Sequence, residues 1–270
     1  MIAAVDVSFV ILTWNSESYI SRCLDSLLVS LEGTGLSFEI FVVDNGSRDT
    51  TADILKVYEK TMQGVVIPIF FKTNLGTTVS RNAALRMVRG VYICVMDSDV
   101  EAIPGVFPKL IEVLCEEPKV GMVVPQILYP SGRWQKSTDR FPTLMHKINR
   151  YFRLRQIEAA EESAAIDNTE KRDVDYAISA LWLFRSEVLE TVGLLDEKIF
   201  YAPEDVDYCL RIWEKGYRIL YFPAVHVIHH TQEISRGFKF NKAKIEHVKG
   251  LIYLFIKHRY VFVGPKFKAP

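Results

Sequence analysis

The first hundred residues alternate four times between an apolar run typical of a strand and an amphipathic stretch typical of a helix. The expected strands cover residues 7–13, 38–43, 65–71 and 91–96, Ser16 is expected to cap the first helix, and the third helix is expected over residues 80–88. Such alternation is the signature of βαβ units, in which parallel strands form a sheet and the helices cover both of its faces. The sequence therefore predicts an α/β fold with a Rossmann-like, mostly parallel central sheet.

Polar residues follow each of these four expected strands. They form the segments 13–15, 44–46, 74–76 and 97–99. The carboxyl ends of parallel strands meet at one edge of a sheet, and ligands bind at that edge in folds of this kind. We therefore expect these four segments to line one binding site.

An Asp-Ser-Asp triplet, running from Asp97 to Asp99, ends the fourth strand. Two carboxylates at this spacing can point at one cation if the backbone turns, and Mg²⁺ and Mn²⁺ prefer such oxygen ligands. The alternative is a solvated turn, which Asp and Ser also favour, but the position at the end of a buried strand supports the cation. Asp44 ends the second strand in the same way. Its carboxylate could accept a hydrogen bond from the N–H of a pyrimidine ring, or simply form a turn with the Asn-Gly that follows.

Beyond residue 100 the pattern is less regular. Helices are expected over residues 104–117 and 204–215, and strands over residues 120–129 and 218–230. Residues 150–173 are charged and poor in aromatic side chains. This composition indicates a mobile, partly helical insertion that could act as a lid over an active site.

Charged residues are balanced over the whole chain but not along it. The 33 basic and 33 acidic side chains give a formal net charge of zero, which argues against a nucleic-acid-binding surface along the whole chain. Residues 236–270 nevertheless carry nine Lys or Arg and one acid, Glu246, so this tail has a net charge of +8 and residues 1–235 one of −8. The acidic part is expected to attract cations and the basic tail to attract anions.

The basic tail contains an amphipathic segment over residues 242–257, with lysines around one apolar face. Such a helix can lie on an anionic membrane surface, or it can pack its apolar stripe onto the protein. No apolar run reaches the roughly 18 residues of a membrane span. We expect no signal peptide, because Asp6 interrupts the first apolar stretch and no basic leader precedes it. The stripe consists of Ile245, Val248, Ile252, Phe255 and Ile256.

Four segments, in this order and spacing, resemble family 2 glycosyltransferases. They are residues 10–15 (Val-Ile-Leu-Thr-Trp-Asn), 42–50 (Val-Val-Asp-Asn-Gly-Ser-Arg-Asp-Thr), 96–99 (Met-Asp-Ser-Asp) and 200–211, which contain Pro-Glu-Asp-Val-Asp. The likeness is closest to the rhamnosyltransferase-like branch. It implies the A-type glycosyltransferase fold, with a catalytic domain over residues 1–235 and a basic amphipathic tail over residues 236–270. Within the domain, residues 1–100 would bind the nucleotide sugar and residues 101–235 the acceptor.

The resemblance also implies a donor site and a metal site. A divalent metal, Mn²⁺ or Mg²⁺, would bridge the diphosphate of a nucleoside-diphosphate sugar, with Asp99, Asp97 and His229 as its ligands. His230 is the other candidate for the histidine ligand. The remaining donor-site residues are Thr13, Asn15, Asp44, Asn74, Gly76, Arg81 and Ser98, together with Asp97.

The acceptor side carries the expected catalytic base. Inversion at an anomeric carbon needs a carboxylate within reach of the acceptor hydroxyl, and the resemblance places it in the pair Glu204 and Asp205. We predict that Asp205 is the base and that Glu204 helps to bind the acceptor. The alternative is that these acids, like Asp207, only complement the dipole of a helix N-terminus. Trp134 and Trp182 could stack on sugar faces or pack in the core.

These features together predict an inverting, metal-dependent hexosyltransferase. It would move one sugar, with rhamnose as the best guess, from a dTDP- or UDP-sugar to a hydroxyl of a glycan or lipid-linked glycan, in cell-surface polysaccharide assembly. The chain lacks the Gln-x-x-Arg-Trp motif and the membrane spans that accompany processive synthases. We expect a cytoplasmic protein that could bind peripherally to the membrane. The alternatives are a sugar-phosphate nucleotidyltransferase and a non-catalytic nucleotide-sugar-binding subunit.

Overall fold

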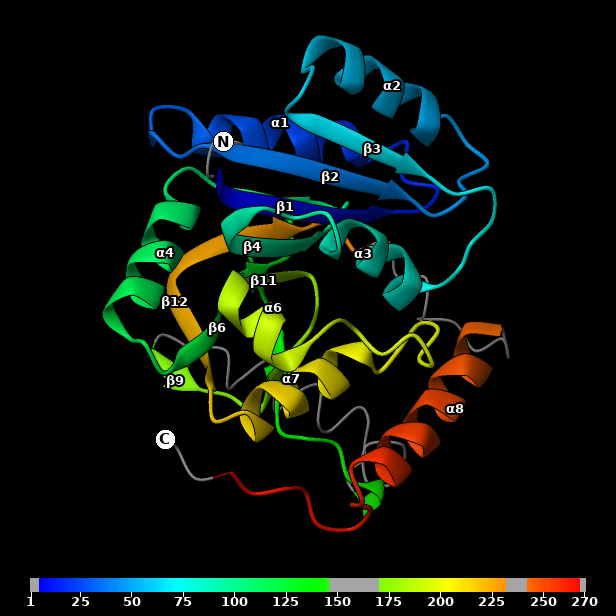
Figure 1. Cartoon of the computed structure of the whole chain (residues 1–270), viewed down its shortest axis with the longest axis vertical. Helices are drawn as coiled ribbons and strands as arrows, with labels where there is room; N and C mark the ends of the chain where they lie inside the picture. Colours follow the sequence, from blue (N-terminus) through cyan, green and yellow to red (C-terminus); the bar gives the residue numbers. More distant parts are fainter. Residues whose placement is uncertain (1–4, 146–169, 232–241, 268–270) are drawn as a thin grey trace.

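A ten-stranded mixed sheet forms the centre of the protein (Figure 1). The computed structural model describes residues 5–145, 170–231 and 242–267. Along the sheet the strands follow the order β3-β2-β1-β4-β11-β6-β12-β5, while β7 pairs with β6 and β9 with β12. A separate two-stranded sheet pairs β8 with β10.

The N-terminal half has the expected parallel βαβ organisation. Strands β1, β2, β3 and β4 are parallel neighbours, and Thr13 at the end of β1 lies opposite Asp44 at the end of β2. The first half contains β1 (Val5–Thr13), α1 (Ile20–Leu31), β2 (Phe38–Asp44), α2 (Thr51–Thr61), β3 (Val66–Phe70), α3 (Thr77–Leu85) and β4 (Gly90–Asp97).

The second half extends the same sheet with strands of mixed direction. Strand β11 is inserted antiparallel between β4 and β6, and β12 then runs parallel to β6. The elements are β5 (Val100–Glu101), α4 (Val106–Glu116), β6 (Val120–Leu128), β7 (Trp134–Gln135), β8 (Thr138–Asp139), β9 (Arg172–Asp173), β10 (Tyr176–Ala177), β11 (Leu181–Arg185), α6 (Ser186–Val192), α7 (Glu204–Glu214), β12 (Arg218–His229) and α8 (Lys242–Lys257).

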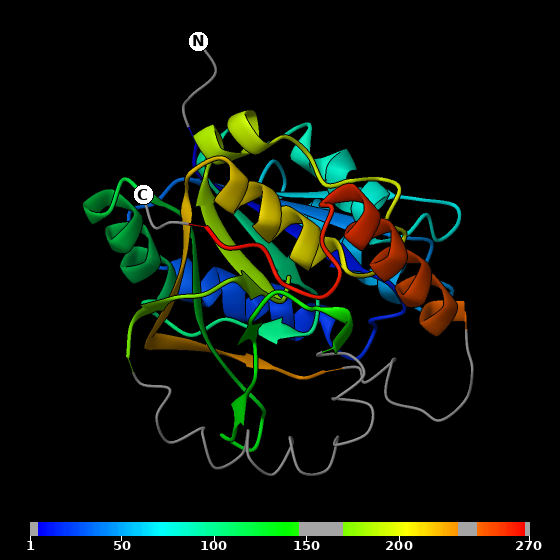
Figure 2. The same cartoon turned by 90° about the horizontal axis from the view of Figure 1, so that it is seen from below.

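Helices cover both faces of the sheet, because successive side chains of a buried strand point to opposite faces. In β1, Phe9 and Ile11 belong to the core cluster under α1 and α4, and the ring of Phe9 meets Phe107 edge-on at 4.9 Å. Val10, between them, belongs to the cluster under α3, α6 and α7. Figure 2 shows α1 on one side of the sheet and α6 and α7 on the other. The mostly parallel sheet with helices on both faces is thus confirmed.

Three details differ from the expectations. The N-cap of α1 is Tyr19 rather than Ser16, whose hydroxyl contacts the carbonyl of Trp14 and the hydroxyl of Ser98. Helix α3 spans Thr77–Leu85 rather than residues 80–88, since Gly76 starts it immediately after the loop. The predicted insertion ends in a strand: Arg172 and Asp173 form β9 on the outer side of β12. Its centre lies outside the described residues.

Candidate active site

Three potential metal ligands converge beyond the end of β4. Asp97 is the last residue of β4, Asp99 follows two positions later, and His229 is the last residue of β12. One ligand atom from each of the three lies within 4.8 Å of the others, and Asp99 Oδ1 is 3.1 Å from His229 Nε2. The structure therefore places the predicted ligands Asp97, Asp99 and His229 around one point.

A second contact fixes the orientation of the histidine ring. Nδ1 of His229 lies 3.1 Å from Oε1 of Gln135 on β7, which leaves Nε2 directed at Asp99. His230 points elsewhere, because its Nε2 contacts Glu101 at 2.8 Å and its Nδ1 contacts Arg22. Of the two candidate histidines, only His229 thus lies in the cluster. Metal-bound histidines commonly have such a partner on the other ring nitrogen.

Electrostatics at this cluster suit a cation. Burial and the nearby charge of Asp99 raise the pKa of Asp97, although the guanidinium of Arg81 acts in the opposite direction. Burial lowers the pKa of His229, but the hydrogen bond and charge of Asp99 outweigh it and raise that pKa. Two carboxylates and one imidazole form a ligand set that fits Mn²⁺ or Mg²⁺ with further oxygen ligands from a substrate.

The ends of β1 and β2 form a preorganised loop pair next to this cluster. Asp44 is buried, and among the described residues its carboxylate accepts the backbone N–H and the hydroxyl of Ser47, both at Oδ1. Asn15, at a backbone φ of +50°, accepts a bond from the N–H of Arg48 at 2.8 Å. The buried hydroxyl of Thr13 has no hydrogen-bond partner within the described part of the chain. An unpaired buried hydroxyl is costly, which is consistent with a ligand that completes it.

The loop after β3 connects the two halves of the protein. Asn45 donates to Oδ1 of Asn74 and to the carbonyl of Gly76. The N–H of Thr77 then bonds the carbonyl of Phe200 at 2.7 Å, just before the acidic segment that starts α7. Asn74 and Gly76 thus shape the loop and bring it against the segment that precedes α7.

Gly76→Ala is expected to destabilise the fold more than Gly193→Ala. Both glycines have positive φ, at +89° and +85°, and strain at such a position costs about 1–3 kcal/mol. Only at Gly76 would a Cβ also meet a carbonyl oxygen, that of Phe200, at 2.3 Å, whereas nothing lies within 4 Å at Gly193. Thermal unfolding of both variants measures the difference, and equal losses would contradict the close packing of this loop.

Arg81 joins the cluster of potential metal ligands to the acidic pair at the start of α7. Its side chain is 1 % exposed, and Nη2 lies 2.5 Å from Asp97 while Nη1 lies 3.4 Å from Glu204. Nη2 also donates to the carbonyl of Ser179, whose own hydroxyl donates to Glu204 at 3.0 Å. The resemblance implied that Arg81 approaches the donor, and in the structure its guanidinium contacts both Asp97 and Glu204.

The acidic pair at the start of α7 lies in two different environments. Burial and the charge of Asp205 raise the pKa of Glu204 to about 8, despite the charge of Arg81. Asp205 is half-buried, and its Oδ1 accepts the N–H of Val206. Burial and the charges of Glu204, Asp97 and Asp205 all raise the pKa of Tyr201, so this tyrosine lies among the three carboxylates. Because its pKa is raised to about 8, Glu204 is mainly protonated at neutral pH.

Two predicted side chains are placed differently from the rest. Ser98, a predicted donor-site residue, is buried, and its hydroxyl contacts the hydroxyl of Ser16 at 3.0 Å. Trp182 cannot stack on a sugar face, because it is fully buried and its ring stacks on Tyr208. Asn45 lies in a segment that was expected to line the site, but neither Asn45 nor Gln135 was predicted to have a role of its own, because their partners Asn74 and His229 lie far away along the chain.

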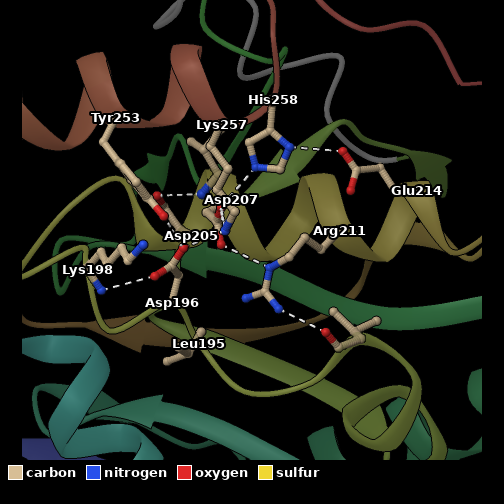
Figure 3. Close-up of polar contacts among 12 residues, drawn as sticks. Leu195, Asp196, Lys198, Asp205, Asp207, Arg211, Glu214, Tyr253, Lys257 and His258 are labelled. Carbon is tan, nitrogen blue, oxygen red and sulfur yellow. Dashed lines mark hydrogen bonds and ion pairs between the residues drawn. The ribbon is translucent and has the colours of Figure 1, made fainter.

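Asp207 has a role that the sequence did not reveal (Figure 3). This fully buried carboxylate contacts Nζ of Lys257 at 2.6 Å and Nε2 of His258 at 2.9 Å, both at the end of α8, and Nε of Arg211 at 3.0 Å. Lys257 also binds Asp196 at 2.7 Å. The polar contacts of Asp207 thus hold α8 on α7, the helix that carries the acidic pair, and Lys257 faces the protein rather than solvent.

His258→Gln is expected to destabilise the protein more at pH 6 than at pH 9. Burial lowers the pKa of His258, but hydrogen bonds to Asp207 and Glu214 outweigh it and raise that pKa. A histidine whose pKa is higher in the folded state stabilises the fold fully at pH values below its unfolded-state pKa of about 6.5. This contribution disappears as the pH rises through the folded-state pKa. Unfolding temperatures of both proteins across this range test the prediction, which a pH-independent difference would contradict.

The same contacts predict that the carboxylate of Asp207 stays charged in acid. Burial raises its pKa, but His258, Arg211 and Lys257 together lower it to about 2. Its contribution to stability is therefore present above the unfolded pKa and is lost only as the pH falls towards 2.

The Rossmann-like sheet carries an Asp-Asp-His cluster at its carboxyl edge, next to the acidic first turn of α7. This combination places the protein in the class of A-type glycosyltransferases. The chain belongs to glycosyl transferase family 2, whose model matches residues 8–193. This membership disfavours a nucleotidyltransferase. Among the described residues, no helix has the length and apolar character needed to cross a bilayer.

Similar proteins agree with this membership. The chain is 24% identical over 262 residues to the N-acetylglucosaminyl-diphospho-decaprenol L-rhamnosyltransferase of Mycobacterium tuberculosis. The alignment covers 92% of this chain and 84% of that protein. This chain is also 27% identical to the uncharacterized glycosyltransferase EpsJ of Bacillus subtilis. That alignment covers 79% of this chain but only 57% of EpsJ. A mannosyltransferase from Pyrobaculum calidifontis, solved with GDP-Man and Mn²⁺, has the same fold with a TM-score of 0.62, at 19% identity, covering 98% of this chain and 67% of that one.

Proposed function

We propose that this protein is an inverting, metal-dependent glycosyltransferase that moves one hexose from a dTDP- or UDP-sugar to a hydroxyl of a lipid-linked glycan. One observation carries the proposal. The guanidinium of Arg81 contacts both Asp97 of the metal cluster and Glu204 of the acidic pair, so donor and acceptor groups would meet at one place. Residues 1–100 would bind the donor and residues 101–235 the acceptor.

The side chains divide the chemistry between them. Asp97, Asp99 and His229 would hold Mn²⁺ or Mg²⁺, which supplies neutralising charge to the leaving diphosphate. Oδ2 of Asp44, which has no hydrogen bond to any of the described residues, would accept the N–H of the pyrimidine, and Thr13 and Asn15 lie beside it. Asp205 would take the proton of the acceptor hydroxyl as that oxygen attacks the anomeric carbon. Glu204, protonated at neutral pH, would donate a hydrogen bond to the acceptor.

Rhamnose is the proposed sugar, and an N-acetylglucosaminyl-diphospho-polyprenol the proposed acceptor. The support is the relative that acts as a rhamnosyltransferase and spans 92% of this chain. A polyprenol-linked acceptor would place the reaction at the cytoplasmic face of a membrane, in the assembly of a cell-surface polysaccharide.

A thermal-shift panel with Mn²⁺ tests the donor first, because a ligand that binds only the folded protein stabilises it by mass action. We expect UDP, dTDP or their sugars to raise the unfolding temperature only with the metal present. Transfer of sugar from the best donor to the polyprenol-linked acceptor tests the reaction itself. If neither UDP nor dTDP raised the unfolding temperature, the proposed donor class would be contradicted.

A further inference from the structure

The helix α8 has two apolar faces, and within the part of the chain that the structure describes only one of them is packed against the protein. Its inner face seats Leu254, which is fully buried, and Gly250, where a Cβ would meet the carbonyl oxygen of Ala202 at 2.2 Å. The opposite face exposes four apolar side chains at helical spacing, with exposed fractions of 46% to 71%. They are Ile245, Val248, Ile252 and Ile256.

The exposed stripe continues into the neighbouring loops. Val261, Phe262 and Val263 follow α8 and are 38% to 70% exposed, and the N–H of Leu144 bonds the carbonyl of Val261 at 2.8 Å. Leu144 and its neighbour Met145 are exposed as well. Figure 1 shows the segment near residue 145 beside the end of α8. We define the α8 patch as the helix stripe together with residues 144–145 and 261–263. A patch of this kind on a single chain marks an interaction site.

Charge identifies the partner. Residues 242–267 contain one acid, Glu246, and its carboxylate is paired with Lys249. Lys249, Arg259 and Lys266 are exposed around the patch, whereas Lys257 is already used in contacts with Asp196 and Asp207. Apolar side chains surrounded by basic ones fit an anionic bilayer, because the apolar groups enter the acyl boundary while the cations meet lipid headgroups.

We propose that the α8 patch docks the protein on an anionic lipid bilayer and that α8 transmits this placement to the active site. Gly250 packs on Ala202, two residues before Glu204, and Asp207 holds the end of the same helix. The acidic pair therefore lies one helix away from the bilayer. The inference deepens the proposed function, because a polyprenol-linked acceptor would be presented at that surface.

Co-sedimentation with phosphatidylcholine vesicles, with and without phosphatidylglycerol, tests the docking without any activity. The protein is expected to bind the anionic vesicles, more weakly at high salt. The double variant Ile252→Glu and Ile256→Glu should lower this binding at least about tenfold. Val57→Glu, at a site of 60% exposure on α2, serves as the matched control and should bind as the unchanged protein does.

Three results would overturn the docking proposal. They are failure of the unchanged protein to bind, equal binding by the double variant, and a concentration-dependent dimer that the double variant abolishes. The last would identify a second copy of the chain as the partner. Phe262→Glu, which lies outside the helix, repeats the test if the double variant does not fold. Stabilisation by UDP and Mn²⁺ is measured on the same variants, so a failed donor site and a failed membrane site are told apart.

Discussion

Asp205→Asn is expected to lower sugar transfer by about 10²–10⁴-fold, the usual contribution of a general base, while leaving nucleotide binding unchanged. The substitution keeps the size of the side chain and its bond to the N–H of Val206, but removes the carboxylate that we propose as the base, while the pKa of Glu204 is raised to about 8. Initial rates of transfer and the thermal shift with UDP and Mn²⁺ measure the two effects separately.

Glu204→Gln is the sharpest comparison for this prediction. Glu204 has a pKa of about 8, so at neutral pH a glutamine resembles its protonated form, and we expect a much smaller loss of rate. Asp53→Asn, on the exposed face of α2, controls for the general loss of one carboxylate. If Glu204→Gln abolished transfer while Asp205→Asn did not, the roles of the two acids would be exchanged.

Asp99→Asn is expected to remove the metal dependence of nucleotide binding and with it sugar transfer. The carboxylate of Asp99 is one of three ligand atoms in the cluster and also orients Nε2 of His229, so its loss affects two of the three ligands. Loss of the neutralising charge at a leaving group costs several kcal/mol of transition-state stabilisation, which corresponds to about 10³-fold or more in rate.

The measurement is a titration with Mn²⁺ in the presence of UDP, followed by the unfolding temperature. His230→Gln is the matched control, because the side chain of His230 contacts Glu101 and Arg22, whereas only its backbone N–H, which the substitution keeps, bonds the carbonyl of Asp99. Retained Mn²⁺ dependence in Asp99→Asn would show that the metal is held elsewhere.

Much of the fold could be predicted because local patterns encode it. The strands that end at Thr13, Asp44 and Asp97 each show a short apolar run followed by a polar turn, and parallel pairing brings such ends to one edge. The predicted helix over residues 242–257 matches α8, because its amphipathic pattern is also local. The cap by Ser16 failed because a side chain that can cap a helix can also find a tertiary partner, here Ser98.

The sequence alone determined the class of the protein, through strand-helix alternation and four short motifs that follow one another in a particular order along the chain. Only the tertiary structure decided which residues meet. The antiparallel insertion of β11 between β4 and β6 brings Ser179 to Glu204, and the end of β12 brings His229 to Asp99, whereas Arg81 reaches Glu204 across 123 residues. The physical reason is that periodicity records which face of an element is buried, whereas a contact between distant side chains depends on how the elements pack.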